Sequence, residues 1–300
     1  MSSGIVQGSA LGPCIFTIFI NDLSTVVKHA KSFLFADDLK LAGDVSTLVD
    51  GERMQSDVNA IADWSIENKL PISLPKCAVL HYGSKNARRQ YVIHQQTVNT
   101  VNSCMDLGVL RCDTFVYDEH IRATYLRGLR LVGMVLKAFG TRQPTLLLKV
   151  FEAYIRPIVE YASPVWSPSR VGMCGLLERV QRKFTKRLVG AAGLNYSQRL
   201  EFFGLASLEM RRSYYDMLLC FKCLHSMMAV ASDDIGLQLC GGPTRANNLR
   251  LQHYKPRSAV IAETFKSRAP VLWGLLPSKV VNCNSISLFK KALLEHLLTP

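Results

Sequence analysis

The sequence lacks the long apolar runs that mark a membrane-spanning protein. No stretch of the 300 residues reaches the roughly 18 consecutive apolar positions that such a helix needs. Residues 1–21 carry no charged side chain. They do not match a secretion signal, because the apolar run has no basic segment before it and is interrupted by Gly8, Gly12 and Pro13. We therefore expect an intracellular protein, in the cytoplasm or the nucleus, that is not secreted and has no membrane partner.

The nine cysteines also lack the pattern of a disulfide framework. Their number is odd and their spacing is irregular, which favours free thiols in a reducing compartment. Cys220, Cys223 and His225 resemble half of a zinc site, but further ligands in a suitable arrangement do not follow nearby. Two interpretations stay open for this segment, a metal site or cysteines buried along a helix.

Acidic side chains are scarce in the middle of the chain. Residues 122–199 hold 14 basic and three acidic residues, a balance of +11. Residues 1–121 hold 10 basic and 13 acidic residues, a balance of −3, and residues 200–300 hold 12 and 7, a balance of +5. The net charge of +13 is therefore concentrated in one segment, which favours a polyanionic partner there. A solvated helix face without such a partner is the alternative.

Low-complexity runs and internal repeats are absent, and 48% of the residues are hydrophobic, which is enough for a core in two or three units.

Residues 4–12 are predicted to form a loop, followed by a helix over about 13–27. Residues 32–43 are predicted to form a strand, a tight turn and a strand, and residues 46–68 a helix. Further short strands are expected, so that residues 1–117 mix helix and strand.

The pattern changes to helical in the second part of the chain. Apolar residues recur at steps of three and four from Ile121 to Phe139. A second helix is expected over residues 144–166, with a break at Pro157, and a third over residues 176–188. The last third of the chain is expected to be mostly helical. These patterns predict the α+β fold class.

Two adjacent carboxylates, Asp37 and Asp38, lie between apolar flanks in the segment "SFLFADDLKL". The simplest interpretation is a hairpin turn, because Asp bonds readily to nearby backbone groups. Asp-Asp is nevertheless a poor two-residue turn, and the apolar flanks predict a largely buried hairpin. Two carboxylates at its tip would repel each other unless a cation lay between them. Divalent metal ions supply that charge, and two of them about 4 Å apart can clamp the oxygens of a phosphoryl transfer.

With this pair in place, the sequence resembles the reverse transcriptases of non-long-terminal-repeat retrotransposons of the jockey type. "FADD" resembles the acidic-turn motif of these proteins. The other blocks follow in the family's order: "GIVQGSALGPCIFTIFINDL" (4–23), "WSIENKLPISLPKCAVLHYG" (64–83), "LGVLRCD" (107–113) and "PVLWGLLPSKVVNCNSISLFKKAL" (270–293). The resemblance implies an RNA-directed DNA polymerase that adds deoxynucleotides by two-metal nucleotidyl transfer, with Mg²⁺ or Mn²⁺. Its partners would be an RNA template and a DNA primer.

The resemblance also assigns roles to individual residues. The catalytic residues would be Asp37, Asp38 and Lys76. Both aspartates would hold metal, and Lys76 would donate a proton to pyrophosphate or, alternatively, be a solvated loop lysine. Template and nucleotide binding would fall to Gln7, Gly8, Ser9, Phe35 and Ala36, and the primer grip to Leu107, Gly108 and Val109. Contacts to the nucleic-acid backbone would come from Arg122, Arg127, Arg130, Arg179, Arg182, Lys183, Lys186 and Arg187.

One part of the family's pattern is not found in the sequence. The family places a third catalytic aspartate and nucleotide-binding fingers upstream of the first block, and here only three residues precede Gly4. We therefore expect a fragment with a partial palm over 1–117, a basic helical thumb over 118–199 and a helical extension over 200–300. Because phosphoryl transfer depends on positioned charges, we expect no useful polymerase activity from this chain alone.

Other functions stay open at this point. The chain can be a non-catalytic nucleic-acid-binding remnant, a helical interaction protein or a group II intron maturase, although the C-terminal block favours the retrotransposon type. Nucleotide addition distinguishes a polymerase from a remnant. Salt-dependent binding to a primer–template distinguishes both from an interaction protein.

Overall fold

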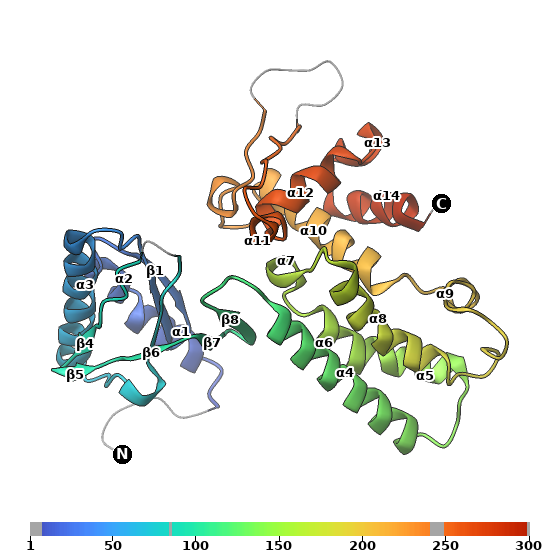
Figure 1. The fold of residues 1–300 in the computed structure, drawn as a ribbon, viewed down its shortest axis with the longest axis horizontal. Coiled ribbons are helices and arrows are strands. Elements are labelled where there is room, and N and C mark those ends of the chain that lie inside the picture. Colours follow the sequence, from blue (N-terminus) through green and yellow to red (C-terminus); the bar gives the residue numbers. More distant parts are fainter. Residues whose placement is uncertain (1–7, 84–85, 241–248, 299–300) are drawn as a thin grey trace. The chain divides into compact units, whose positions relative to one another are not determined.

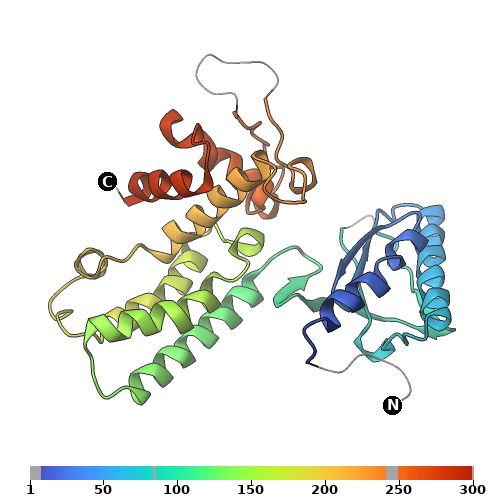
Figure 2. The ribbon, with the colours of Figure 1, turned by 180° about the vertical axis from the view of Figure 1, so that it is seen from behind.

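The chain folds into two compact units in the computed structural model (Figure 1; Figure 2 shows the same ribbon from behind). The structure describes residues 8–83, 86–240 and 249–298. The first unit comprises Met1–Asp106 and Arg111–Phe115, and the second comprises Leu107–Leu110 and Val116–Pro300. Helices and short two-stranded sheets make up the first unit and helices the second, which is consistent with the α+β fold class.

The first unit combines helices with short strands. Its helices are α1 (Gly12–Ile20), α2 (Leu23–Val26) and α3 (Leu48–Glu67), with a short 3-10 turn at Leu74–Lys76. The strands, of which the last lies partly in the second unit, are β1 (Lys31–Phe35), β2 (Asp38–Ala42), β3 (Ala78–Leu80), β4 (Val92–Ile93), β5 (Gln96–Thr97), β6 (Asn99–Val101), β7 (Ser103–Asp106) and β8 (Val109–Cys112). The pairs β1–β2 and β4–β5 are antiparallel, β3–β6 is parallel, and β7 pairs with β8.

Helix α3 organises the core of the first unit. It begins with a capping box, in which Thr47 accepts the N–H of Asp50 and Asp50 accepts the N–H of Thr47. Ile61 and Trp64 then lie three residues apart on the buried side and pack with Ile20. The predicted helix over residues 46–68 and its apolar stripe are therefore confirmed.

The second unit is helical. Its elements are α4 (Asp118–Ala138), α5 (Pro144–Val150), a π-helical segment (Phe151–Ile155), α6 (Arg156–Glu160), α7 (Ser163–Trp166), α8 (Val171–Thr185), α9 (Tyr196–Phe203), α10 (Leu208–Leu224), a 3-10 turn (Asp233–Ile235), α11 (Ala259–Ala262), α12 (Phe265–Gly274), α13 (Ser278–Val281) and α14 (Ile286–Leu298). None of the helices within the described ranges is long and apolar enough to cross a membrane.

The predicted helix break at Pro157 is wrong. Helix α5 widens into the π-helical segment, in which the N–H of Arg156 reaches back five residues to the carbonyl of Phe151. Helix α6 then continues through Pro157, which occupies its first turn. The wider turn accommodates a proline that has no N–H to donate and whose ring would clash with a carbonyl of a regular α-helix. Helix α6 ends at Glu160, and the next residues leave the helical conformation, with Ala162 at a φ of +52°.

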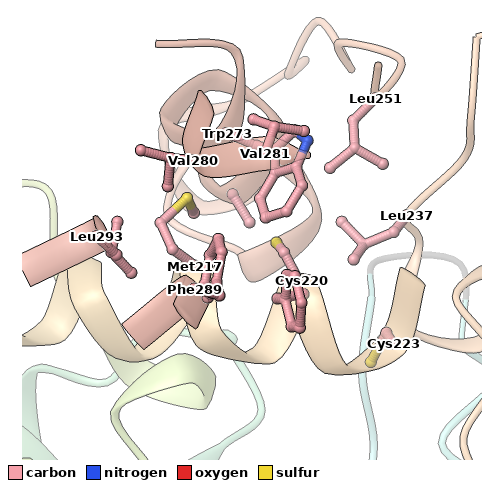
Figure 3. Close-up of a cluster of buried hydrophobic side chains, with 12 residues drawn as sticks. Met217, Cys220, Cys223, Leu237, Leu251, Trp273, Val280, Val281, Phe289 and Leu293 are labelled. Atoms are coloured by element: carbon pink, nitrogen blue, oxygen red, sulfur yellow. The ribbon is translucent and has the colours of Figure 1, made fainter. Parts of the chain in front are cut away.

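Helix α10 takes part in two hydrophobic clusters of the second unit. Leu208, at its start, belongs to a cluster with Val132, Phe151 and Phe184. Farther along α10, Met217 and Cys220 point toward Trp273 and Val281 (Figure 3). The predicted boundary between residues 199 and 200 therefore lies within one unit, and helices from both sides of it share a core.

The segment around Cys220 and Cys223 is part of that core. Both side chains are buried, and His225 stacks on Phe221. The described part of the chain holds no cluster of three or more His, Cys, Asp or Glu side chains suited to a metal ion. This supports the interpretation of Cys220 and Cys223 as buried helix cysteines.

Candidate functional site

The acidic pair lies at the tip of a β-hairpin, as predicted. In the antiparallel β1–β2 pair, Phe35 is the partner of Asp38, so that Ala36 and Asp37 form the two-residue turn. Ala36 has a φ of +49°, a left-handed conformation that costs free energy for a residue with a Cβ. Strain of this kind at a turn that also carries two carboxylates is typical of a functional site.

The prediction that this hairpin is largely buried is wrong. Leu34, Leu39 and Leu41 face the core of the first unit, whereas Phe33 and Phe35 are 52% and 65% exposed. Side chains alternate between the two faces of a strand, and only one face of this two-stranded sheet packs on the helices. Asp37 and Asp38 are exposed, and neither forms an ion pair with another described residue. The two carboxylates are thus free to take a cation.

The approach to β1 is fixed by a buried carboxylate. Asp57 on α3 is 2% exposed and accepts the backbone N–H groups of Lys28, His29 and Ala30 at 2.9, 2.9 and 2.6 Å. Burial by itself would raise the pKa of Asp57, but these hydrogen bonds outweigh burial and hold the pKa below its usual range. Asp57 therefore anchors the segment that leads into the acidic hairpin.

A second carboxylate connects this hairpin to β7 within the first unit. Asp106, at the end of β7, accepts a hydrogen bond from Lys40 Nζ of β2 at 2.5 Å and forms an ion pair with Arg111, whose Nε lies 2.6 Å away. Burial would raise the pKa of Asp106, but the two cations outweigh it and lower the pKa. The end of β7 is thereby held against the strand that carries Asp38.

The turn after Asp106 has the geometry of a tight hairpin. Leu107 and Gly108 both have a positive φ, +45° and +80°, as in type I′ turns. Within the second unit, Tyr161 donates its hydroxyl to the carbonyl of Leu107 at 2.9 Å, and Val109 is buried against Ile121. A Cβ on Gly108 would lie 3.2 Å from the Tyr161 ring, so glycine suits the close approach as well as the φ.

Of the other predicted site residues in the first unit, Phe35 and Ala36 adjoin the acidic pair, whereas Gly8 and Ser9 precede α1 and Lys76 lies in the 3-10 turn. Gly8 has a φ of +88°, and Ser9 accepts the N–H of Gly12 at the start of α1. Gln7 lies outside the described residues. Lys76 is exposed in the 3-10 turn, and the described contacts include no hydrogen bond or ion pair from it to Asp37 or Asp38. The proton-donor role of Lys76 stays a prediction.

The predicted basic residues lie on α4 and α8. All eight are exposed, and none forms an ion pair with a carboxylate among the described residues: Arg122, Arg127 and Arg130 on α4, and Arg179, Arg182, Lys183, Lys186 and Arg187 on or directly after α8. Steps of three and four place the α8 set on one side of the helix. Arg182 also stacks over the ring of Tyr196 at 4.6 Å.

Sequence reasoning missed Asp57, Asp106 and Tyr161. The burial of Asp57 could have been predicted from the sequence, because an acidic residue four positions before the apolar Ile61 lies on the buried side of the helix. The link from Asp106 to Lys40 and the bond from Tyr161 to Leu107 had no such signal, since these partners are 66 and 54 residues apart in the chain.

Comparison with known proteins identifies relatives of this chain. Residues 1–110 match the family model described as reverse transcriptase (RNA-dependent DNA polymerase). The chain is 21% identical, over 205 residues, to the RNA-directed DNA polymerase from mobile element jockey of Drosophila funebris; this covers 64% of the present chain and 22% of that protein. No solved structure matches the chain. The two matches support a reverse transcriptase domain of the non-long-terminal-repeat retrotransposon type, as the sequence motifs predicted.

Proposed function

We propose that this chain, with its reverse transcriptase domain, carries part of the machinery of an RNA-directed DNA polymerase whose metal site is built on the tip of the β1–β2 hairpin. The observation that carries the proposal is the geometry of that tip, where Asp37 and Asp38 are adjacent, exposed and free of ion pairs with described residues. The hairpin lies within residues 1–110, the segment that matches the family model.

The donor set at the tip fits a hard divalent cation. Carboxylate oxygens are the ligands that Mg²⁺ and Mn²⁺ prefer, and Mg²⁺ commonly takes one or two of them and completes its shell with water and substrate phosphates. Asp37 and Asp38 would hold the ion. When bound, the metal would neutralise charge that develops during phosphoryl transfer. Tests should decide between Mg²⁺ and Mn²⁺.

The remaining roles follow from the placement of the residues. We infer that Phe35, Ala36, Gly8 and Ser9, with Gln7, border the template and the incoming deoxynucleotide. The Leu107–Val109 turn would support the primer. In this proposal the palm comprises residues 1–117, and residues 200–300 are a C-terminal extension.

Helices α4 and α8 would act as a thumb, over residues 118–199, that contacts a primer–template. Their exposed cations have no carboxylate partners in the described part of the chain and suit the phosphates of a duplex of any sequence. Binding through phosphates would release counterions and so depend strongly on salt.

A second candidate function is nucleic-acid binding without catalysis. It is favoured by one observation: within the described residues, no third carboxylate, histidine or cysteine joins Asp37 and Asp38. The α4 and α8 cations would bind nucleic acid whether or not the acidic hairpin supports chemistry.

One experiment separates the two functions. The purified chain is given a primed RNA template, deoxynucleotides and Mg²⁺ or Mn²⁺, and both binding and primer extension are measured. Two carboxylates supply only part of the charge that the metal site of a polymerase needs. The loss of one charged interaction lowers the catalytic rate about a thousand-fold, so we expect primer extension at or below about 0.01 s⁻¹. Slow extension that disappears in the Asp37→Ala, Asp38→Ala variant supports the polymerase. Binding without extension supports the second function, and absence of binding contradicts both.

A further inference from the structure

The segment that contains the proposed primer support, Leu107–Leu110, is held at both ends by side chains of the second unit. Tyr161 donates its hydroxyl to the carbonyl of Leu107, and His120 Nδ1 accepts the backbone N–H of Leu110 at 3.2 Å. Between these two bonds, Val109 is buried in an apolar cluster with residues of α4, α7 and α8. The segment therefore has a hydrogen bond at each end and an apolar anchor between them.

The hydrogen bond from Leu110 requires a neutral His120. A backbone N–H can only donate, so Nδ1 must carry a free lone pair. The proton of the neutral ring is then on Nε2, which lies 3.5 Å from the hydroxyl oxygen of Thr124. A charged imidazolium has a proton on both nitrogens and cannot accept the N–H of Leu110. The bond at this end of the segment exists only while His120 is neutral.

The surroundings of His120 also favour the neutral ring. The side chain is 8% exposed, and its ring lies beside that of Trp166, with 5.3 Å between the ring centres. Burial lowers the pKa of His120 below the ordinary value of 6.5. A charged ring in this position would lose its hydration as well as the bond to Leu110. Protonation of His120 and release of Leu110 are therefore expected to occur together.

Charged neighbours do not oppose this effect of burial. Those on the elements around His120 are paired with other groups or exposed: Asp118 with Arg170, Arg111 with Asp106, Glu178 with the N–H of Leu208, and Glu119, Arg122 and the basic residues of α8 in exposed positions. Helix α7, which supplies Trp166, has no charged residue. The protonation of His120 therefore depends on burial and on its hydrogen bonds.

We propose that His120 is a positioning residue for the primer support at Leu107–Val109. Its neutral ring holds the segment on the second unit, and protonation of the ring releases the Leu110 end. The functional part of this inference rests on the role proposed above for Leu107–Val109. The link between His120 and the segment does not, and it can be measured without nucleic acid.

The test is a pH titration of the ¹⁵N-labelled full chain, from about pH 8 to about pH 4.5, that follows the amide signals of Gly108 and Leu110. Both signals should move with one midpoint below pH 6.5. His120→Asn places an amide oxygen near the position of Nδ1 and does not titrate, so its Leu110 signal should stay constant. His253→Asn, which changes an exposed histidine of the same unit, should behave as the unmodified chain does.

A second variant tests the other end of the segment. Tyr161→Phe removes the hydroxyl that bonds to Leu107 and keeps the ring beside Gly108. The segment is then held less firmly, so that His120 is protonated more easily and the midpoint at Leu110 should rise toward 6.5 by up to about one pH unit. The titrations of the unmodified chain and of Tyr161→Phe decide the question even where His120→Asn does not fold.

The affinity for a primer–template, measured by fluorescence anisotropy over the same pH range, tests the functional part. Other histidines also become charged in acid and strengthen binding to phosphates, so the unmodified chain is compared with His120→Asn at each pH. Its dissociation constant relative to that of the variant should rise about two- to tenfold as the pH falls through the midpoint, the effect of about one hydrogen bond.

Each outcome has a defined meaning. The proposal is overturned if Leu110 does not titrate, if His120→Asn titrates as the unmodified chain does, if the midpoint is unchanged in Tyr161→Phe, or if the ratio of the two dissociation constants is the same at every pH. Absence of primer–template binding at every pH would instead contradict the proposed function. The amide titration would then still decide whether His120 controls the segment.

Discussion

At the scale of single residues, the position of the acidic hairpin depends on side chains that take no part in the proposed metal binding. Asp57 binds three backbone N–H groups directly before β1, and Asp106 binds Lys40 on β2. Both carboxylates are charged groups that accept hydrogen bonds in partly buried surroundings, where such bonds are stronger than in water. The position of Asp37 and Asp38 therefore rests on these two anchors.

Replacing Asp57 tests the first anchor. In Asp57→Asn the side chain keeps its shape but loses the charge that strengthens its three hydrogen bonds. We expect the first unit to lose about 1.5–3 kcal/mol of stability, the usual contribution of hydrogen bonds to a charged group. Urea unfolding followed by the ¹⁹F signal of fluorinated Trp64 measures this unit by itself. Asp63→Asn, on an exposed position of the same helix, should change stability by less than about 0.5 kcal/mol.

The same carboxyl groups predict how the first unit responds to acid. The pKa values of Asp57 and Asp106 are both below the ordinary value of 3.8. Such groups stabilise the folded state above pH 3.8, and this stabilisation is lost as the pH falls through their folded pKa values. The free energy of unfolding, measured by Trp64, should therefore change little down to about pH 5 and fall as the pH is lowered further. The fall should be smaller in Asp57→Asn; an equal fall in both proteins would contradict the role given to Asp57.

At the scale of elements, sequence periodicity predicted the local structure well. The apolar steps in α3, α4 and α8 and the alternation around "FADD" gave the correct element types. The exposure of Phe33 and Phe35 was not predictable, because it depends on how many strands and helices cover the hairpin. The π-helical segment before Pro157 was missed for a similar reason: helix packing holds a proline that local propensity would place at a break.

The basic face of α8 makes a prediction about nucleic-acid binding. Changing Arg179, Arg182, Lys183 and Lys186 to Gln removes four positive charges. If all four contact phosphates, the slope of log K against log salt should become shallower by about 3–4, since each contact contributes about 0.9. Binding to a primer–template is measured by fluorescence anisotropy between low and moderate salt.

A matched variant controls for net charge. Changing the exposed Lys255, Lys279, Lys290 and Lys291 to Gln removes the same charge outside α8. It should change the slope by less than one. Equal effects of the two variants would mean that α8 has no special role.

At the scale of the whole molecule, the division into two units differs from the predicted three-part order. The carboxylate of Glu178 on α8 accepts the N–H of Leu208 at the start of α10, and Gln181 donates to the carbonyl of Ala206. These bonds join residues on either side of position 199. These bonds could not be predicted from the sequence. The predicted boundary followed the change in charge balance, which shows where the composition of a chain changes and not where a hydrophobic core ends.

Fragments test this division. Residues 107–300 should fold by themselves and unfold cooperatively on heating, as seen by circular dichroism. Residues 107–199 should not, because they lack Leu208 of the shared cluster and the N–H that Glu178 binds. A cooperative transition of the shorter fragment would show that the thumb-like helices are an independent unit.

The central claim is that Asp37 and Asp38 form the metal site of a polymerase, and Mn²⁺ titration of the ¹⁵N-labelled chain tests it most directly. Paramagnetic Mn²⁺ should broaden the amide signals of residues 35–39 first. Asp37→Asn with Asp38→Asn should remove that broadening, whereas Asp63→Asn with Glu67→Gln, a pair of exposed acids on α3, should keep it. Broadening that begins elsewhere, or that persists at the hairpin without its two carboxylates, would contradict the account.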